Sequence, residues 1–345
     1  SKVERVPFGV VGVIGPWNYP MHTPMGSISY ALAAGNCVVF KPSEYTPRIG
    51  KLLAEKFNLV APNSYIFQSL DGAPELGIQL TKANVDKIAF TGSTEVGKII
   101  ARAIAGTEKK ATLELGGKAA NIIYDDAAID QAVEGIINGI FFNQGHVCCA
   151  GSRLLVQESI YSTVLDKLQE RMAKIRVGDP MDKNTDLGAI NSAPQLAKIK
   201  ELTSAGDSEG AVRWSSPCEL PKKGFWFAPT IFTGVTESHR IAREEIFGPV
   251  LSILTFRTPS EAIEKANATP YGLSAGIWSE KSSKILWTAQ NLRAGVIWSN
   301  TFNKFDPASP FGGYKESGWG REGGRHGLQA YLRSSVKSIS QKGGK

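Results

Sequence analysis

This chain of 345 residues has few cysteines, few histidines and no long apolar run. Four cysteines and four scattered histidines give neither a disulfide framework nor the spacing of a metal site, so we expect no metal and a reducing, cytoplasmic location. No apolar run approaches the roughly 18 residues that suggest a membrane-spanning helix. The net charge of +7 is dispersed, so we expect neither nucleic acid nor membrane as a partner.

The first third of the chain alternates short apolar runs with helical patterns. The run at 10–14 is too short for a signal peptide, and Pro16 ends it, so it is interpreted as a first strand. Such alternation predicts an α/β fold built from βαβ units on a parallel sheet. The predicted strands here are 10–14, 37–40 and 87–90, and the predicted helices are 20–34, 94–105 and one from about residue 47.

The alternation continues with different chemistry. Residues 205–224 are rich in polar residues, Gly, Pro and Ser, and are predicted to form a loop or small hairpin. Residues 331–340 are predicted to form a terminal strand, and 341–345 to fray. The other predicted strands are 111–115, 120–124, 153–157, 225–232 and 250–256, and the predicted helices are 129–140, 161–175 and 260–267.

Cys148 lies in a turn of small residues between a predicted helix and a predicted strand. A thiol is nucleophilic near neutral pH when its pKa is lowered or its proton is taken. Gly and Ala around it let a ligand approach the backbone closely. An isolated Cys, however, is more often a small buried hydrophobe.

Two polar residues in unusual settings are candidate partners for a nucleophile. Glu114 follows an apolar run at a strand end, where burial would raise its pKa and suit it to act as a general base. The alternatives are a solvated Glu or a pair with Lys118. Asn18, held between Pro16 and Pro20, could stabilise an oxyanion, although a turn or N-cap is the commoner role of Asn.

Two further segments suit a nucleotide. Residues 90–98 follow a strand and open a helix, where free N–H groups and the helix dipole favour phosphate, but they match neither standard glycine-rich motif. Lys41 and Glu44 close the second strand and could bind a ribose. An acidic residue there favours NAD over NADP, whereas the plain alternative is a surface ion pair.

Five stretches together resemble the aldehyde dehydrogenase superfamily, of the NAD(P)-dependent hydrolytic type. The Leu-Glu-Leu-Gly-Gly-Lys run and the turn around Cys148 are the most specific, and the spacing of Glu114 and Cys148 also matches. The resemblance covers essentially the whole chain in the family's order. The stretches are 15–18, 41–44, 90–93, 113–118 and 144–151, extended by 245–249 and 309–313.

The resemblance implies a fold and three domains. Residues 1–115 would form a Rossmann-type parallel-sheet NAD-binding domain, shortened at its N-terminus, and 116–325 an α/β catalytic domain. Residues 326–345 would carry an oligomerisation strand, whose usual hairpin partner is expected to be absent. Family members usually have more than a hundred further residues before this start, so the chain is interpreted as a fragment or a natural short form, with an exposed apolar flank. The segment 57–77 departs from the family pattern and puts adenine contacts in doubt.

The resemblance also implies roles for matching residues in oxidising an aldehyde to a carboxylic acid with NAD. Cys148 would be the nucleophile, passing through a thiohemiacetal and a thioester, with Cys149 a non-catalytic neighbour. Glu114 would activate water, and Asn18 would hold the oxyanion with the N–H of Cys148. The cofactor would contact Ile14, Trp17, Lys41, Glu44, Gly92, Ser93, Gly97, Leu115, Glu245 and Phe247, and the aldehyde tunnel would be walled by Tyr19, Phe305 and Phe311.

Two other functions compete with this one. A CoA-acylating enzyme would resolve the thioester with a thiol, which needs no base for water, so Glu114 argues against it. A catalytically silent scaffold has no chemical need for Asn18, Glu114 and Cys148 together. The identity of the aldehyde does not follow from the sequence, because a methylene changes discrimination by only roughly 1–3 kcal/mol. A homo-oligomer, dimer or tetramer, is expected.

Overall fold

The computed structural model describes residues 2–337 and contains two compact units. Unit 1 comprises residues 1–115, 306–312 and 318–345, and unit 2 comprises 116–305 and 313–317. The chain passes between them after residue 115, where a domain boundary was expected. Residues 306–312 and 318–325, expected in the catalytic domain, pack instead with unit 1. The functions given to these domains stay predictions.

Unit 1 is built on a six-stranded sheet with the order β14-β6-β5-β2-β3-β4. All neighbours are parallel except β14, which pairs antiparallel with β6. The strands are β2 (Val10–Ile14), β3 (Cys37–Lys41), β4 (Phe67–Ser69), β5 (Lys87–Thr91), β6 (Lys110–Glu114) and β14 (Gly318–Trp319). The helices are α1 (His22–Ala33), α2 (Pro47–Val60), α3 (Pro74–Lys82), α4 (Thr94–Ile104) and α11 (Gly324–Gln329).

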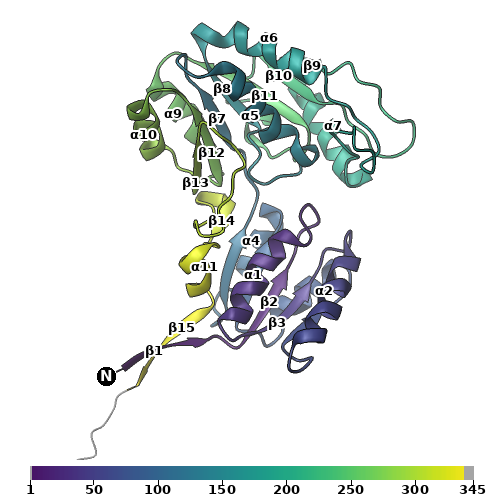
Figure 1. Cartoon of the computed structure of the whole chain (residues 1–345), viewed down its shortest axis with the longest axis vertical. Coiled ribbons are helices and arrows are strands. Elements are labelled where there is room, and N and C mark those ends of the chain that lie inside the picture. Colours follow the sequence, from purple (N-terminus) through teal and green to yellow (C-terminus); the bar gives the residue numbers. More distant parts are fainter. Residues whose placement is uncertain (1, 338–345) are drawn as a thin grey trace, which may run out of the picture. The chain divides into compact units, whose positions relative to one another are not determined.

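Helices cover both faces of this sheet, which explains why its central strands β2, β3 and β5 are mostly apolar. Val11 and Val13 of β2 pack with Ile28 of α1 on one face. Ile14, one position out of phase, packs with Ile100 of α4 on the other. This alternation follows the period of two of a strand. Figure 1 shows α1 and α2 on one side of the sheet and α4 on the other.

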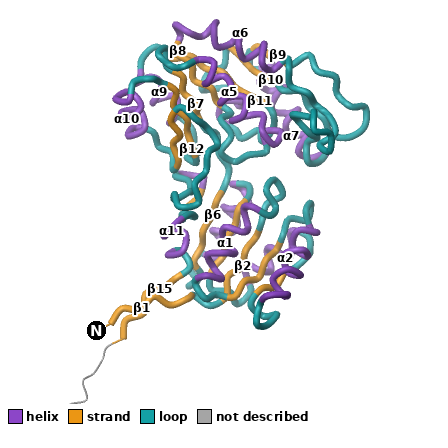
Figure 2. The backbone as a smooth tube through the Cα atoms, in the orientation of Figure 1, coloured by secondary structure: helices purple, strands orange, loops and turns teal. Residues whose placement is uncertain are grey.

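A separate two-stranded ribbon joins the ends of the described chain. β1 (Lys2–Pro7) pairs antiparallel with β15 (Leu332–Lys337), and Figure 2 shows the two strands running side by side. The expectation that the terminal strand lacks a hairpin partner is therefore wrong, because the first residues of the chain supply one. The expected continuation to residue 340 and the fraying of 341–345 lie outside the described residues.

Unit 2 is built on a seven-stranded sheet with the order β13-β12-β7-β8-β11-β10-β9. Only the edge strand β9 runs antiparallel to its neighbour. The strands are β7 (Ala120–Ile123), β8 (Arg153–Gln157), β9 (Val212–Ser215), β10 (Thr230–Thr233), β11 (Val250–Phe256), β12 (Ser274–Trp278) and β13 (Val296–Ser299). The α-helices are α5 (Ile129–Phe141), α6 (Tyr161–Met172), α7 (Ala193–Ser208), α8 (Arg240–Arg243), α9 (Pro259–Asn267) and α10 (Ser282–Asn291). Short 3-10 turns are η1 (Phe142–Gly145), η2 (Glu158–Ile160) and η3 (Lys315–Ser317).

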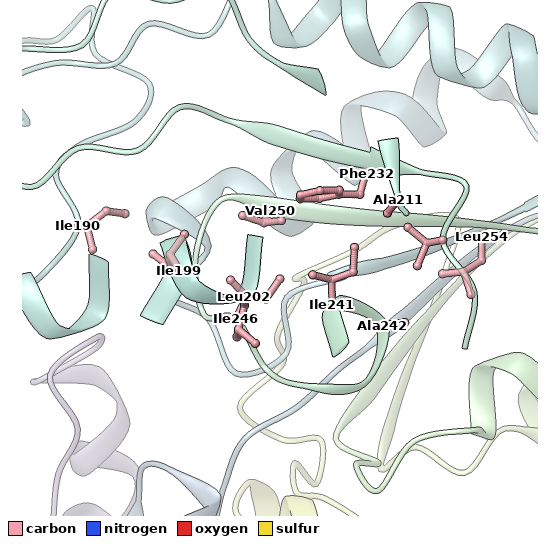
Figure 3. Close-up of a cluster of buried hydrophobic side chains, with 11 residues drawn as sticks. Ile190, Ile199, Leu202, Ala211, Phe232, Ile241, Ala242, Ile246, Val250 and Leu254 are labelled. Atoms are coloured by element: carbon pink, nitrogen blue, oxygen red, sulfur yellow. The ribbon is translucent and has the colours of Figure 1, made fainter. Parts of the chain in front are cut away.

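Two predictions in unit 2 are wrong in part. The predicted loop at 205–224 begins inside α7 and contains the edge strand β9. The predicted strand at 225–232 begins only at Thr230, because Pro229 cannot donate to a ladder hydrogen bond. Gly206 of α7 packs so closely that a Cβ there would lie 2.9 Å from Ile241 Cδ1. The buried cluster around Ile199, Leu202 and Phe232 in Figure 3 fixes α7 over β10 and β11.

No helix within residues 2–337 is long and apolar enough to cross a membrane. The search of the same residues finds no cluster of three acidic, His or Cys side chains that could hold a metal ion.

Candidate active site

The motifs of unit 1 meet at the carboxyl ends of adjacent parallel strands. Residues 15–18 follow β2, and Gly92 and Ser93 follow β5, its hydrogen-bonded neighbour. From β2 the chain continues to β3 and β4 on one side of the sheet and then returns to β5 and β6 on the other side. The strand order therefore reverses between β2 and β5. Ligands of open α/β sheets bind at such a switch point. Asn18, half-buried with Trp17 and Tyr19, lies in the loop after β2.

The N-terminus of α4 is built as an anion-binding end. Ser93 caps the helix, its Oγ accepting from Val96 N at 3.3 Å. Gly97 is buried, and a Cβ there would lie 2.4 Å from Leu115 Cδ2. Helix and strand therefore approach each other closely. The first N–H groups of a helix have no partner within it and suit a phosphate.

Lys41 and Glu44 lie at the carboxyl end of β3. The Lys41 side chain is buried, and its Nζ lies 3.3 Å from Glu44 Oε2, whose side chain is 41% exposed. A buried cation beside an accessible carboxylate offers the donor and the acceptor that ribose hydroxyls need. Together with the end of α4, these residues fit a dinucleotide such as NAD.

Glu114 is the last residue of β6 and is only 5% exposed. Its backbone pairs with Gly318 of β14. A Cβ on Gly312 would lie 2.8 Å from Glu114 Oε1, so the chain after Phe311 passes directly over the carboxylate. Of the alternatives left open by the sequence, the structure shows the buried one, and the general-base role stays a prediction.

A buried polar cluster behind β6 was missed from the sequence. Lys87 Nζ donates to Thr112 Oγ1 at 2.7 Å and lies 4.8 Å from the centre of the Tyr331 ring. Burial lowers the pKa of Lys87 to about 8 and raises that of the Glu322 carboxyl, which accepts a hydrogen bond from Ser27 Oγ. The only sequence signal was a lysine opening an apolar strand.

In unit 2, the Cys148 turn depends on left-handed backbone. Asn143, Gln144 and Gly145 have φ values of 49°, 58° and 73°. A Cβ on Gly145 would lie 2.1 Å from Gly248 O, so the turn packs directly on that backbone. Gln144 Oε1 also accepts from Gly188 N at 3.0 Å. The turn precedes β8 at the amino end of the strand.

Cys148 is half-buried and Cys149 is buried, and the roles assigned to them stay predictions. The pKa of the Cys148 thiol is raised, first by its hydrogen bond with Cys149, then by burial, and further by the charges of Cys149 and Glu245. Cys149 Sγ in turn donates to Asn303 Oδ1 at 3.3 Å. The Cys148 side chain therefore rests as a thiol, which would have to lose its proton before it could act as a nucleophile.

Glu245 and Phe247 lie just before β11, also at an amino strand end. Gly117 N donates to Glu245 Oε1 at 2.9 Å. The Phe247 ring, on a residue with φ of 56°, stacks on His146 with centroids 5.7 Å apart. Burial lowers the pKa of His146 to about 4, so this imidazole is neutral at pH 7.

The predicted site residues divide between the units. Unit 1 carries Asn18, Glu114 and most cofactor residues, and unit 2 carries Cys148, Glu245 and Phe247. Of the predicted tunnel aromatics, Tyr19 and Phe311 belong to unit 1, whereas Phe305 is in unit 2, exposed and edge-on to Trp298 at 5.5 Å.

The dinucleotide-type sheet edge of unit 1 and the thiol-bearing turn of unit 2 are features typical of a nucleotide-dependent enzyme. The chain belongs to the aldehyde dehydrogenase family, which matches residues 1–337. An aldehyde dehydrogenase of Enchytraeus buchholzi is 45% identical over 96% of this chain and 67% of its own length. An NAD-dependent aldehyde dehydrogenase from Sinorhizobium meliloti is 40% identical, with a TM-score of 0.96 over 99% of this chain and 69% of that one.

An NAD⁺ complex of an aldehyde dehydrogenase from Bacillus cereus matches with a TM-score of 0.95 and 38% identity, over 99% of this chain and 70% of that one. The chain spans about two thirds of the length of its curated relatives. The expected family, α/β fold and class of enzyme, an NAD-dependent aldehyde dehydrogenase, are confirmed.

Proposed function

We propose that this chain oxidises an aldehyde to a carboxylic acid with NAD, using Cys148 as the nucleophile. The observation that carries the proposal is the turn that contains Cys148. Its residues 143–145 have a left-handed backbone, Gly145 packs on the backbone of Gly248, and the Cys148 carbonyl lies beside Gly117, which donates to Glu245. A turn that accepts this backbone strain at a half-buried thiol is typical of a functional site.

Each catalytic step has a proposed residue. The Cys148 thiol releases its proton to solvent as Sγ bonds to the carbonyl carbon, and the Asn18 amide and the Cys148 N–H donate to the oxyanion. Bound NAD supplies the hydride acceptor for oxidation of the resulting thiohemiacetal. Glu114 then takes a proton from water, whose oxygen attacks the thioester carbon and releases the acid and the Cys148 thiol.

The cofactor residues proposed for NAD are Ile14, Trp17, Lys41, Glu44, Gly92, Ser93, Gly97, Leu115, Glu245 and Phe247. The accessible Glu44 carboxylate supports NAD over NADP, because it would repel a 2′-phosphate. Replacing Glu44 with Gln should weaken this preference at least several-fold. Titration of both cofactors, followed by the quenching of Trp fluorescence, measures it without needing turnover. An unchanged ratio contradicts this role of Glu44.

Hydrolysis rather than acyl transfer to CoA is supported by the burial of Glu114, because a dry carboxylate suits a base for water. Glu114→Gln should accumulate a Cys148 thioester, detected as a stable acyl adduct by mass spectrometry. An acyl-CoA product whose formation depends on added CoA would favour the alternative enzyme.

The central experiment compares two neighbouring thiols. Oxidation of an aldehyde panel, including substrates that Tyr19, Phe305 and Phe311 would contact, is followed as reduced nicotinamide. Cys148→Ala should abolish oxidation and retain NAD binding, whereas Cys149→Ser should retain both. Substantial turnover by Cys148→Ala overturns the mechanism. Intact NAD binding with no turnover and no electrophile labelling of Cys148 in the unaltered chain would favour a silent scaffold.

We also propose a cytoplasmic homo-oligomer. The β1–β15 ribbon supports the homo-oligomer. Within the described residues each of its two strands has only one hydrogen-bonded neighbour, so each has a free edge, and a free strand edge is a template for association. Sedimentation velocity should show a dimer or tetramer, and Val3→Pro, on an exposed position of β1, should reduce association. A monomer at all concentrations contradicts this proposal.

A further inference from the structure

Unit 2 contains a small cavity at the amino ends of β7, β8 and β12, against the end of α9. Its volume is about 20 Å³, enough for a small guest. We name it the basic cavity, because its charged wall residues are Lys118, Arg153 and Arg293 and none is acidic. Its walls are residues 118–120, 153, 266, 267, 269, 271–275 and 292–294.

Lys118 is the first group that needs a partner there. It is 2% exposed, and its Nζ has no hydrogen-bond partner within residues 2–337. A buried ammonium without a partner is costly. Burial and then the charge of Arg153 lower the pKa of Lys118 to about 7, and the Lys198 charge adds to this, while Glu245 and Glu244 act in the opposite direction. Neither of these carboxylates lines the cavity.

Arg153 adds a second buried charge. Its guanidinium donates to three carbonyl oxygens, those of Lys118, Lys265 and Ala266, at 2.7–2.9 Å. Carbonyls orient the group but do not neutralise it. Its pKa, lowered to about 10 by burial and partly restored by Glu237, still leaves it cationic at pH 7. Since a guanidinium has five N–H donors, two remain for a guest.

Two more cations lie close to this cavity. The exposed Arg293 lines it, and its guanidinium forms no ion pair in the described part of the chain. Lys315 Nζ donates to the carbonyls of Asn267 and Thr269, and its pKa is lowered by burial and by the charges of Arg293 and Arg153. Four cations therefore act on the cavity, and the carboxylates that oppose them, Glu237, Glu244 and Glu245, lie outside its wall.

We propose that the basic cavity binds a small inorganic anion of halide or phosphate type, held by the Lys118 ammonium and the free N–H groups of Arg153. An anion offsets both buried charges, whereas water would satisfy Lys118 and leave the positive field uncompensated.

The first test is crystallographic and uses bromide. Crystals of the full chain grown with sodium bromide should show an anomalous peak within hydrogen-bond distance of Lys118 Nζ. Competition with inorganic phosphate distinguishes the two anions, because phosphate that enters the cavity removes the peak. An ordered water in its place, or bromide only at other sites, overturns the proposal.

The second test measures binding in solution. At constant ionic strength, replacing isethionate with chloride should raise the thermal midpoint saturably. Lys118→Met should weaken the apparent affinity at least tenfold, and Arg293→Gln should weaken it less. Lys167→Met, an exposed lysine elsewhere in unit 2, is the matched control and should change nothing. If the thermal midpoint of Lys118→Met rises with chloride and saturates at the same concentration as in the unaltered chain, the proposed site is contradicted. If that variant does not fold, the bromide map of the unaltered chain decides.

Discussion

Replacing Arg153 with Met should strongly destabilise unit 2. The guanidinium is buried and joins the residues before β7 to the end of α9 through three hydrogen bonds. Leaving a buried carbonyl without its donor costs about 1–3 kcal/mol. The carbonyls of Lys118 and Ala266 are buried and that of Lys265 is partly buried, so the three together cost roughly 3–8 kcal/mol. Removing the buried charge returns part of this.

The free energy recovered by removing the buried charge can be estimated from the pKa of Arg153. Burial lowers this pKa from its ordinary value to about 10, which measures how strongly burial disfavours the charged form. At 1.36 kcal/mol for each unit, this is on the order of 3 kcal/mol. The net loss for Arg153→Met is therefore about 3 kcal/mol. Arg153→Lys should lose less, because an ammonium keeps the charge and reaches at least one carbonyl.

Urea unfolding followed by Trp fluorescence measures this loss. Trp214, Trp226, Trp278, Trp287 and Trp298 lie in unit 2, so the signal reports mainly on that unit. Arg257→Met is the matched control. Arg257 is exposed and paired with Glu158 at 2.7 Å, and such pairs contribute about 0–1 kcal/mol. If Arg153→Met costs no more than Arg257→Met, the reasoning from buried carbonyls is refuted.

Three further predictions follow from the site. Between pH 8 and 10.5 Lys87 loses its proton in the native state before it does in the unfolded chain, so the free energy of unfolding should rise with pH. Lys87→Met should remove that rise when the free energy of unfolding is measured by urea titration at each pH. If the variant and the unaltered chain show the same pH dependence, the prediction is contradicted. Gly145→Ala should lower the free energy of unfolding clearly more than Gly106→Ala. Gly106 also has a left-handed backbone, but a Cβ there would meet nothing within 4 Å. Equal urea midpoints for the two variants would show that the backbone at Gly248 moves to make room. Cys149→Ala should shift the pH profile of Cys148 alkylation to lower pH while Cys149→Ser does not, and identical shifts would exclude the thiol–thiol hydrogen bond as the cause.

Most central strands of both sheets could be predicted, because strands covered on both faces have continuous apolar sequences. β12 and β13 were nevertheless missed, although β12 is buried throughout. The errors lie where composition and structure diverge. Helix α7 has a weakly amphipathic, small and polar sequence, and Gly206 within it serves close packing rather than a turn. β9 is a short edge strand with mostly exposed residues, so no apolar alternation marks it.

The catalytic motifs could be recognised, but the buried cations could not. Lys87, Lys118 and Arg153 are ordinary charged residues in the sequence, and a charge is usually solvated. Only the fold places them under strands and beside carbonyls. The pairing of β1 with β15 was missed for a similar reason, because antiparallel partners at opposite ends of a chain share no local signal.

The run 113–118 connects the two units, so its residues have structural roles that no single one of them would indicate alone. Its first part ends β6 with Glu114, and its second part begins unit 2, where Gly117 holds Glu245. A Cβ on Gly117 would lie 2.3 Å from Cys148 O, so only glycine fits beside the nucleophile's backbone. Burial of Glu114 removes the solvated alternative, and Lys118 Nζ, which makes no hydrogen bond within residues 2–337, removes the pair. The general-base role of Glu114 stays a proposal, and Glu114→Gln is the variant that tests it.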